Sequence, residues 1–191
     1  ITTFLGSIDL VGLPNMDETF INVNIKEFET SKSDLDQIPL PPFDDRKFLK
    51  TPDNIATLGR IRFKGDFTGF INDFVAYGKL TTAIGSIESD IKLSLQDDDY
   101  EYNGKLSTKE FDLGRFYKNT SLGKLSSSLS LNGSGLTLDK LDAKVQGTIQ
   151  SITILDYLYK DLKMDGEFKD RYFDGELRVR DQNIQMVFNG E

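Results

Sequence analysis

Three short runs of alternating residues near the end of the chain constrain its fold most strongly. Between Asp161 and Gly190, apolar side chains occupy every second position of each run, and polar breaks at Lys169–Arg171 and Asp181–Asn183 separate the runs. A period of two is typical of a β-strand with one apolar and one wet face. Short polar breaks between such runs indicate antiparallel neighbours. The stretch therefore predicts an antiparallel meander whose apolar face must be buried against something.

The same alternation extends over most of the chain. From Gly59 onwards, strand-like runs and turn signals follow one another regularly, and two further runs, Phe4–Leu10 and Phe20–Phe28, lie near the start. Almost no stretch has the period of a helix. We therefore expect an all-β fold of about a dozen strands, in which residues 1–191 form one segment and residues 59–191 form its regular part.

Residues 30–58 interrupt this regularity. Two proline clusters argue against strands here, because proline cannot donate a hydrogen bond to a sheet. We predict an ordered excursion that contains a short helical turn at Ser33–Ile38 with Ser33 as its cap. A second short turn is expected at Phe111–Tyr117. The apolar residues of the excursion that we expect to pack onto the sheet are Phe43, Phe48, Leu49, Ile55 and Leu58.

Glycines recur at an even spacing in the regular part of the chain. Gly104, Gly147 and Gly190 occupy comparable positions in three strand-like runs and are 43 residues apart. A period of this order is typical of stacked supersecondary units. The spacing favours an open stack of strands.

Composition excludes several classes of function. The chain has no His and no Cys, so it cannot hold a Ser-His-Asp or Cys-His catalytic site or a typical zinc site. A net charge of −8 argues against nucleic-acid binding. The acidic clusters Asp44–Asp45 and Asp97–Asp99 are best explained as solvated turns and lack calcium-loop spacing. We therefore predict a protein that is not an enzyme and that carries no cofactor and no metal.

Several short motifs in the second half carry a resemblance. They occur in a fixed order and at regular spacing, and each is part of a strand that ends in or near glycine. They are F-D-L-G at Phe111–Gly114, L-N-G-S-G-L at Leu131–Leu136, L-D-A-K-V-Q-G-T-I-Q-S-I at Leu141–Ile152, Y-F-D-G at Tyr172–Gly175 and F-N-G at Phe188–Gly190. The chain resembles the repeats of the TamB family, translocation and assembly module proteins of the AsmA-like superfamily, in their Bacteroidetes-type form. The match covers residues 100–191 well and 59–99 loosely, whereas residues 1–58 share only strand character.

The resemblance implies a particular architecture and role. Proteins of this family fold into an open β-trough with an apolar interior, also called a β-taco or half-pipe. They are anchored in the inner membrane, cross the periplasm and meet an Omp85-type partner in the outer membrane. They are implicated in outer-membrane protein assembly and in moving phospholipid between the membranes. This chain is then expected to be an internal, periplasmic, non-enzymatic fragment of such a trough, and phospholipid or another apolar chain its ligand.

The apolar positions of the alternating runs are the candidate lipid-facing residues. The same alternation is also typical of the closed core of a β-sandwich, so the pattern alone does not distinguish a groove from a core. The candidates are Ile61, Phe63, Phe67, Ile91, Leu93, Leu95, Leu129, Leu131, Val145, Ile149, Leu162, Met164, Phe168, Leu177, Val179, Ile184, Met186 and Phe188.

Two other kinds of binding module fit the same sequence. One is an extracytoplasmic β-sandwich or solenoid that binds a protein or a glycan. The other is a closed lipid-binding barrel of lipocalin type, although the absence of Trp removes a motif common in such barrels. An open trough, by contrast, has unpaired strands at both ends, so it predicts a possible dimer through exposed strand edges.

Overall fold

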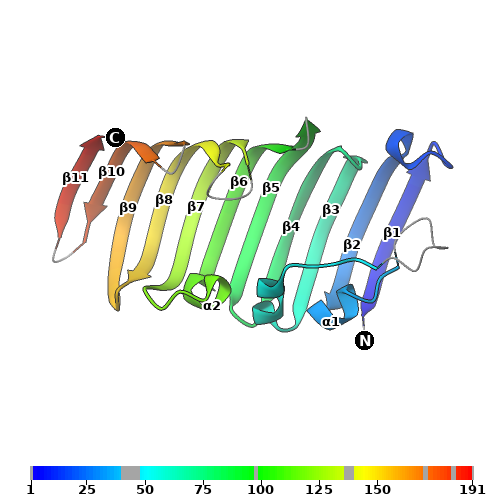
Figure 1. Ribbon diagram of the computed structural model, residues 1–191, viewed down its shortest axis with the longest axis horizontal. Helices are drawn as coiled ribbons and strands as arrows, with labels where there is room; N and C mark the ends of the chain where they lie inside the picture. Colours follow the sequence, from blue (N-terminus) through cyan, green and yellow to red (C-terminus); the bar gives the residue numbers. More distant parts are fainter. Residues whose placement is uncertain are drawn as a thin grey trace.

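The fold is a single antiparallel sheet whose strands follow one another in chain order (Figure 1). The computed structural model describes residues 2–39, 48–96, 99–135, 140–169, 172–181 and 184–190. The strands are β1 Thr3–Val11, β2 Phe20–Thr30, β3 Ile61–Phe70, β4 Asp73–Thr82, β5 Gly85–Gln96, β6 Asp99–Asp112, β7 Leu122–Ser134, β8 Asp142–Ile154, β9 Tyr157–Lys169, β10 Tyr172–Arg180 and β11 Gln185–Gly190. The meander predicted from Asp161–Gly190 is confirmed as β9, β10 and β11.

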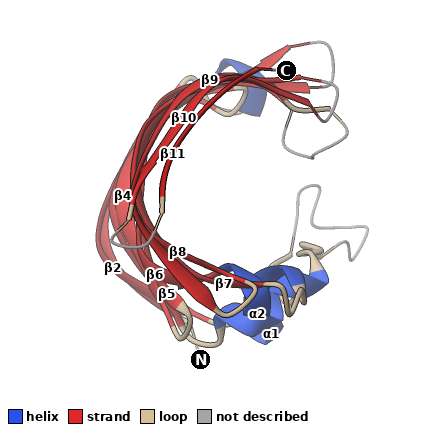
Figure 2. Cartoon of the chain, turned by 90° about the vertical axis from the view of Figure 1, so that its left-hand side faces the viewer, coloured by secondary structure: helices blue, strands red, loops and turns tan. Residues whose placement is uncertain are grey.

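The sheet is open. Among the described strands, β1 pairs only with β2 and β11 pairs only with β10, so the two ends of the sheet do not meet. Viewed along its length, the sheet curves into a C-shaped trough (Figure 2). The all-β open trough is thus confirmed, and neither a closed barrel nor a two-sheet sandwich describes the chain.

Strand register gathers the apolar side chains on one face. Leu131 lies opposite Val145, which in turn lies opposite Gly166, and the same matching of alternate positions runs across the sheet. Because successive side chains of a strand point to opposite faces, each run contributes its apolar half to one surface. The other surface is mainly polar, with a few exposed apolar or aromatic side chains such as Val75 and Tyr77.

Four short helices accompany the sheet in the described part of the chain. They are η1 Met16–Glu18, α1 Lys32–Leu35, η3 Asp53–Leu58 and α2 Leu113–Tyr117. In Figure 2, α1 and α2 lie on the inner side of the C, at one rim. Leu58 of η3 and Phe116 of α2 pack in a cluster with Ile61 and Phe111 of the sheet. The apolar face is therefore the concave face of the trough.

The first helical turn starts earlier than the sequence analysis predicted. Ser31, not Ser33, is the N-cap, and its hydroxyl accepts a hydrogen bond from the Asp34 N–H. A cap residue keeps an extended backbone while its side chain satisfies an N–H of the first turn. Ser31 has this backbone, whereas Ser33 is already inside the helix. The second turn, α2, was predicted correctly and is capped by Asp112.

Some of the apolar residues that were predicted to pack the excursion onto the sheet do so, at the rim of the trough. Leu58 is buried and Ile55 packs against the same cluster, while Leu49 is half-buried. Phe48 was predicted to pack on the sheet, but 49% of it is exposed, so that prediction was wrong. It lies in an isolated bridge with Pro39, away from the helical packing. Phe43 lies outside the described residues.

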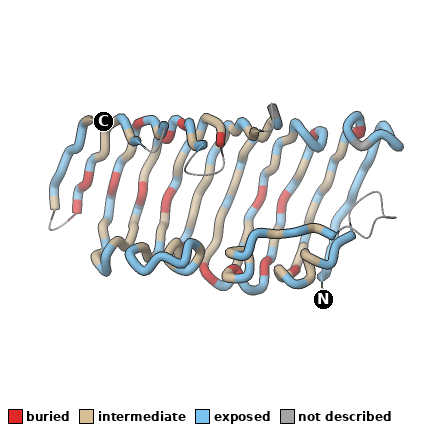
Figure 3. The backbone as a smooth tube through the Cα atoms, viewed as in Figure 1, coloured by how far each residue is buried: buried red, intermediate tan, exposed pale blue. Residues whose placement is uncertain are grey.

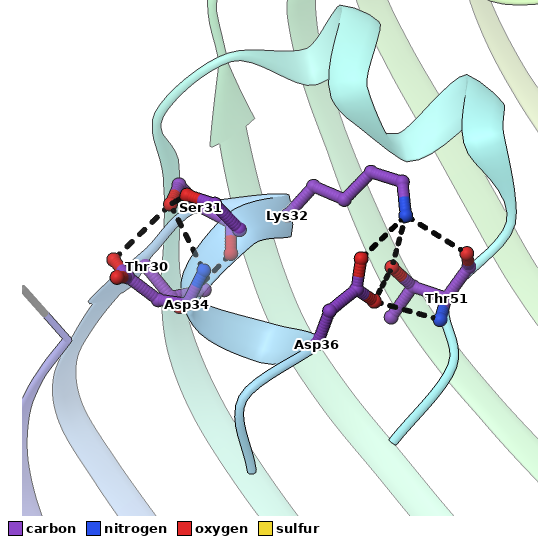
Figure 4. A network of polar contacts seen from close by, with 7 residues as sticks. Thr30, Ser31, Lys32, Asp34, Asp36 and Thr51 are labelled. Atoms are coloured by element: carbon purple, nitrogen blue, oxygen red, sulfur yellow. Dashed lines mark hydrogen bonds and ion pairs between the residues drawn. The ribbon is translucent and has the colours of Figure 1, made fainter. Parts of the chain in front are cut away.

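A polar network holds the excursion together (Figure 4). The Lys32 ammonium donates to Asp36 Oδ2 at 2.6 Å and to the Thr51 carbonyl at 3.1 Å. Thr51 donates through its backbone N–H and its hydroxyl to Asp36 Oδ1, at 2.9 and 2.6 Å. These bonds tie α1 to the segment that leads into η3. We call this unit, residues 31–38 and 48–58, the strap.

Candidate functional site, the concave apolar face

The concave face brings all the predicted lipid-facing positions onto one surface. Adjacent candidates are matched across the strands, as where Leu162 lies opposite Val179 and Leu177 lies opposite Phe188. Ile184 lies just before β11 and packs against the buried cluster of Ile149, Leu162 and Val179. The register therefore groups these side chains on one face, the concave one.

These side chains differ in how far they are covered (Figure 3). Five of the predicted positions are buried, namely Ile61, Val145, Ile149, Leu162 and Val179. Leu95, Met186 and Phe188 are 41–47% exposed. The remaining ten are half-buried. Neighbouring side chains and the rim helices cover part of the face, and no second sheet covers the rest among the described residues.

Sequence reasoning missed other members of this face. On β4, Phe74, Ala76 and Leu80 lie opposite concave residues of β3 and β5. Their alternation is hidden because Val75 and Tyr77, on the other face, are also apolar or aromatic. The register of the neighbouring strands is the signal that assigns them. Concave residues of other strands that were not among the lipid-facing candidates are Phe4, Ile8, Leu10, Ile21, Val23, Ile25, Phe28, Tyr102, Leu106 and Phe173.

No charged side chain occupies the concave positions of the regular strand pairs in the described part of the chain. Several of the polar groups that occur there form hydrogen bonds. Ser127 is buried and its hydroxyl lies 2.9 Å from that of Thr108. Tyr102 donates to the carbonyl oxygens of Ser134 and Gly135, and burial raises the pKa of its phenol. The concave face of the described strands is therefore uncharged and mainly apolar.

Glycines allow neighbouring strands and aromatic rings to approach closely on the concave face. Gly65 lies opposite Gly78, and the ring of Phe63 extends over both. A Cβ on Gly78 would fall 2.5 Å from that ring. At Gly104 the backbone has a φ of +155°, and a Cβ there would meet the Asp90 carbonyl oxygen. Glycine is needed at such positions because it allows both the close approach and the bend of the strand.

The convex face has the opposite character. It carries exposed ion pairs such as Lys79–Glu88 at 2.6 Å and Lys92–Asp73 at 3.1 Å. A hollow of about 430 Å³ lies on this face over β2–β6 and is lined mainly by polar and charged side chains. Surface ion pairs contribute little stability and are screened by salt. Charged and polar side chains dominate this surface, although apolar side chains such as Val75 and Val187 are also exposed on it.

Among the described residues, no three His, Cys, Asp or Glu side chains are grouped so that they could hold a metal ion. The acidic clusters at residues 44–45 and 97–98 lie outside the described residues, and Asp99 begins β6. The structure therefore directs attention to the concave face.

Comparison with known proteins gives no relative: no family model, no curated protein and no solved structure matches the chain significantly. None of the helices in the described part of the chain has the length and apolar character needed to cross a membrane. Function must therefore be argued from the geometry of the trough.

Proposed function

We propose that this chain is a non-enzymatic section of an apolar conduit that carries phospholipid or another acyl chain between membranes. The observation that supports it best is the uncharged concave face, which crosses every described strand and remains open along one side. The TamB resemblance of the sequence points in the same direction. With that resemblance, the proposal includes a periplasmic location, an anchor in the inner membrane and an Omp85-type partner in the outer membrane.

The energetics favour such a role without a catalytic group. Removing a methylene from water is worth about 0.8 kcal/mol, so about 16 carbons exposed to water cost on the order of 10 kcal/mol. Neighbouring strands lie about 4.8 Å apart, so the concave face of the described strands forms a continuous apolar surface about 50 Å long. An acyl chain that moves along this surface avoids most of the cost of water exposure.

The same surface suits a second task that the resemblance implies. A nascent outer-membrane strand also presents an apolar side that must be shielded from water, and the uncharged concave face offers a matching surface. We therefore propose support of outer-membrane protein assembly as a second role of the same surface. In both roles the concave face shields an apolar group from water, and neither role needs a catalytic residue.

A matched pair of variants on β11 tests the proposal. Phe188 on the concave face and Val187 on the convex face are neighbours, 41% and 58% exposed. Phe188→Asp introduces a charge into the groove, while Val187→Asp introduces the same charge outside it. We expect Phe188→Asp to weaken binding of a fluorescent phospholipid by the purified chain at least tenfold and Val187→Asp to leave it unchanged. Equal binding by both variants, each folded by circular dichroism, would contradict the proposal.

A further inference from the structure

The convex hollow over β2–β6 contains a charge arrangement that the fold alone does not explain. Three lysines line it side by side, namely Lys26 on β2, Lys64 on β3 and Lys79 on β4. Lys64 lies directly opposite Lys79, and like charges that face each other across two strands destabilise a sheet. The whole chain has a net charge of −8, so this gathering of cations runs against its overall character. An anion bound between the ammonium groups would relieve the repulsion.

A β-bulge brings Lys26 into this cluster. Lys26 and Glu27 together lie opposite Lys64, because β2 has one residue more than β3 at this point. Bulges redirect a side chain and are frequent beside functional sites. Lys79 forms an ion pair with Glu88 at 2.6 Å, whereas no carboxylate of the described residues forms an ion pair with Lys26 or Lys64. Two ammonium groups are therefore available at this end of the hollow.

The other end of the hollow has a different chemistry. Tyr77 is 60% exposed and lies between two carboxylates, opposite Asp66 of β3 on one side and Asp90 of β5 on the other. The Asn24 side-chain amide donates to Asp66 at 2.6 Å. The ring of a tyrosine offers an apolar face, and the carboxylates beside it accept hydrogen bonds from hydroxyl groups. This combination is typical of sites that bind a sugar ring.

The two ends together define the chemistry of a ligand. Lys64 and Asp66 are two residues apart on β3, which separates the two ends by about 7 Å. Asp66 and Asp90 repel an anion, so the anionic group of a ligand belongs beside the lysines and its hydroxyl groups belong beside Tyr77. A sugar ring with a carboxylate or phosphate substituent has both features. The hollow of about 430 Å³ is within the usual size range of small-ligand sites.

We propose that the convex hollow binds an acidic saccharide, with the anionic group held by Lys26 and Lys64 and the sugar ring stacked on Tyr77. The site lies on the opposite face of the sheet from the apolar groove. It therefore goes beyond the proposed function and does not depend on it. In a longer trough, such a site attaches the outer wall to a glycan while the concave face remains free.

An NMR titration of the ¹⁵N-labelled chain tests the site with four probes. Trigalacturonate and phosphorylated glucose carry both a sugar ring and an anion, maltotriose carries only sugar rings, and inorganic phosphate is only an anion. We expect the two acidic sugars to shift the amide signals of Lys64 and Tyr77 and to bind at least tenfold more tightly than maltotriose or phosphate. Absence of binding by both acidic sugars would overturn the proposal. Equally tight binding of phosphate alone would also overturn it, because the site would then recognise an anion and no sugar.

Two variants with matched controls locate the binding. Lys64→Gln and Tyr77→Ala should each weaken the binding of trigalacturonate at least tenfold. Lys144→Gln and Tyr172→Ala change exposed residues outside the hollow and should leave the binding unchanged. Lys64→Gln should also raise the urea midpoint of unfolding, because it removes one of two facing like charges. Binding that survives both Lys64→Gln and Tyr77→Ala, or that falls equally in the controls, would overturn the inference.

Discussion

At the scale of single residues, Asp36 shows how the strap depends on one carboxylate. Hydrogen bonds, the strongest from Lys32 and the next from the Thr51 side chain, lower the pKa of Asp36 from 3.8 to about 2. The charged carboxylate is therefore favoured in the folded chain. A carboxyl group whose pKa is lowered by folding stabilises the fold above its unfolded pKa, and this contribution is lost as the pH falls through the folded value.

The strap should therefore weaken as the pH falls from about 4 to about 2. We expect the Asp36 carboxyl carbon to titrate with a midpoint near 2 in a ¹³C NMR experiment. The Thr51 amide signal should move with it, because this N–H donates to Asp36. Lys32→Met is the control and should raise the midpoint towards 3.8. A midpoint that is the same in both proteins would show that the Lys32 contact does not act on Asp36.

At the scale of elements, the strap attaches to the trough through a small apolar cluster. Leu58 is 5% exposed and packs with Ile61, Ile84 and Phe111, whereas Phe48 of the same excursion is 49% exposed. A buried leucine loses both its transfer energy and the contacts around the cavity when it is truncated. The strap is thus held at η3.

Two alanine variants of the strap should differ clearly. Leu58→Ala should lower the free energy of unfolding by about 2–5 kcal/mol, whereas Phe48→Ala should change it by less than about 0.5 kcal/mol. Urea denaturation followed by far-ultraviolet circular dichroism measures both. If the two losses were equal, the excursion would not be held through η3.

The sequence predicted the regular elements better than the excursion, for a physical reason. A period of two identifies a strand when one face is apolar and the other polar, as in β9 and β10. It weakens on β4, where Val75 and Tyr77 make both faces apolar or aromatic. In the strap, the cap and the packing depend on which backbone groups are unsatisfied and on distant side chains. Neither Ser31 as the cap nor the exposure of Phe48 can be read from a local pattern.

At the scale of the whole molecule, curvature and openness determine what the trough can do. The alternation grouped the candidate residues on one face, but the same alternation would suit a closed sandwich. What distinguishes the two is that β1 and β11 do not meet and that no other described layer covers the concave side. Glycines at close strand contacts such as Gly65–Gly78 allow the sheet to remain tightly paired along this length.

The measurement that tests the central claim most directly is site-specific photo-crosslinking of the intact protein in the cells that make it. The probe is placed at Leu177 or Met186 on the concave face, and at Arg178, the convex neighbour of Leu177. We predict that phospholipid crosslinks to positions 177 and 186 and not to position 178. Crosslinks from 177 and 186 only to other parts of the protein would mean that these residues form a closed core, and this result would contradict the conduit.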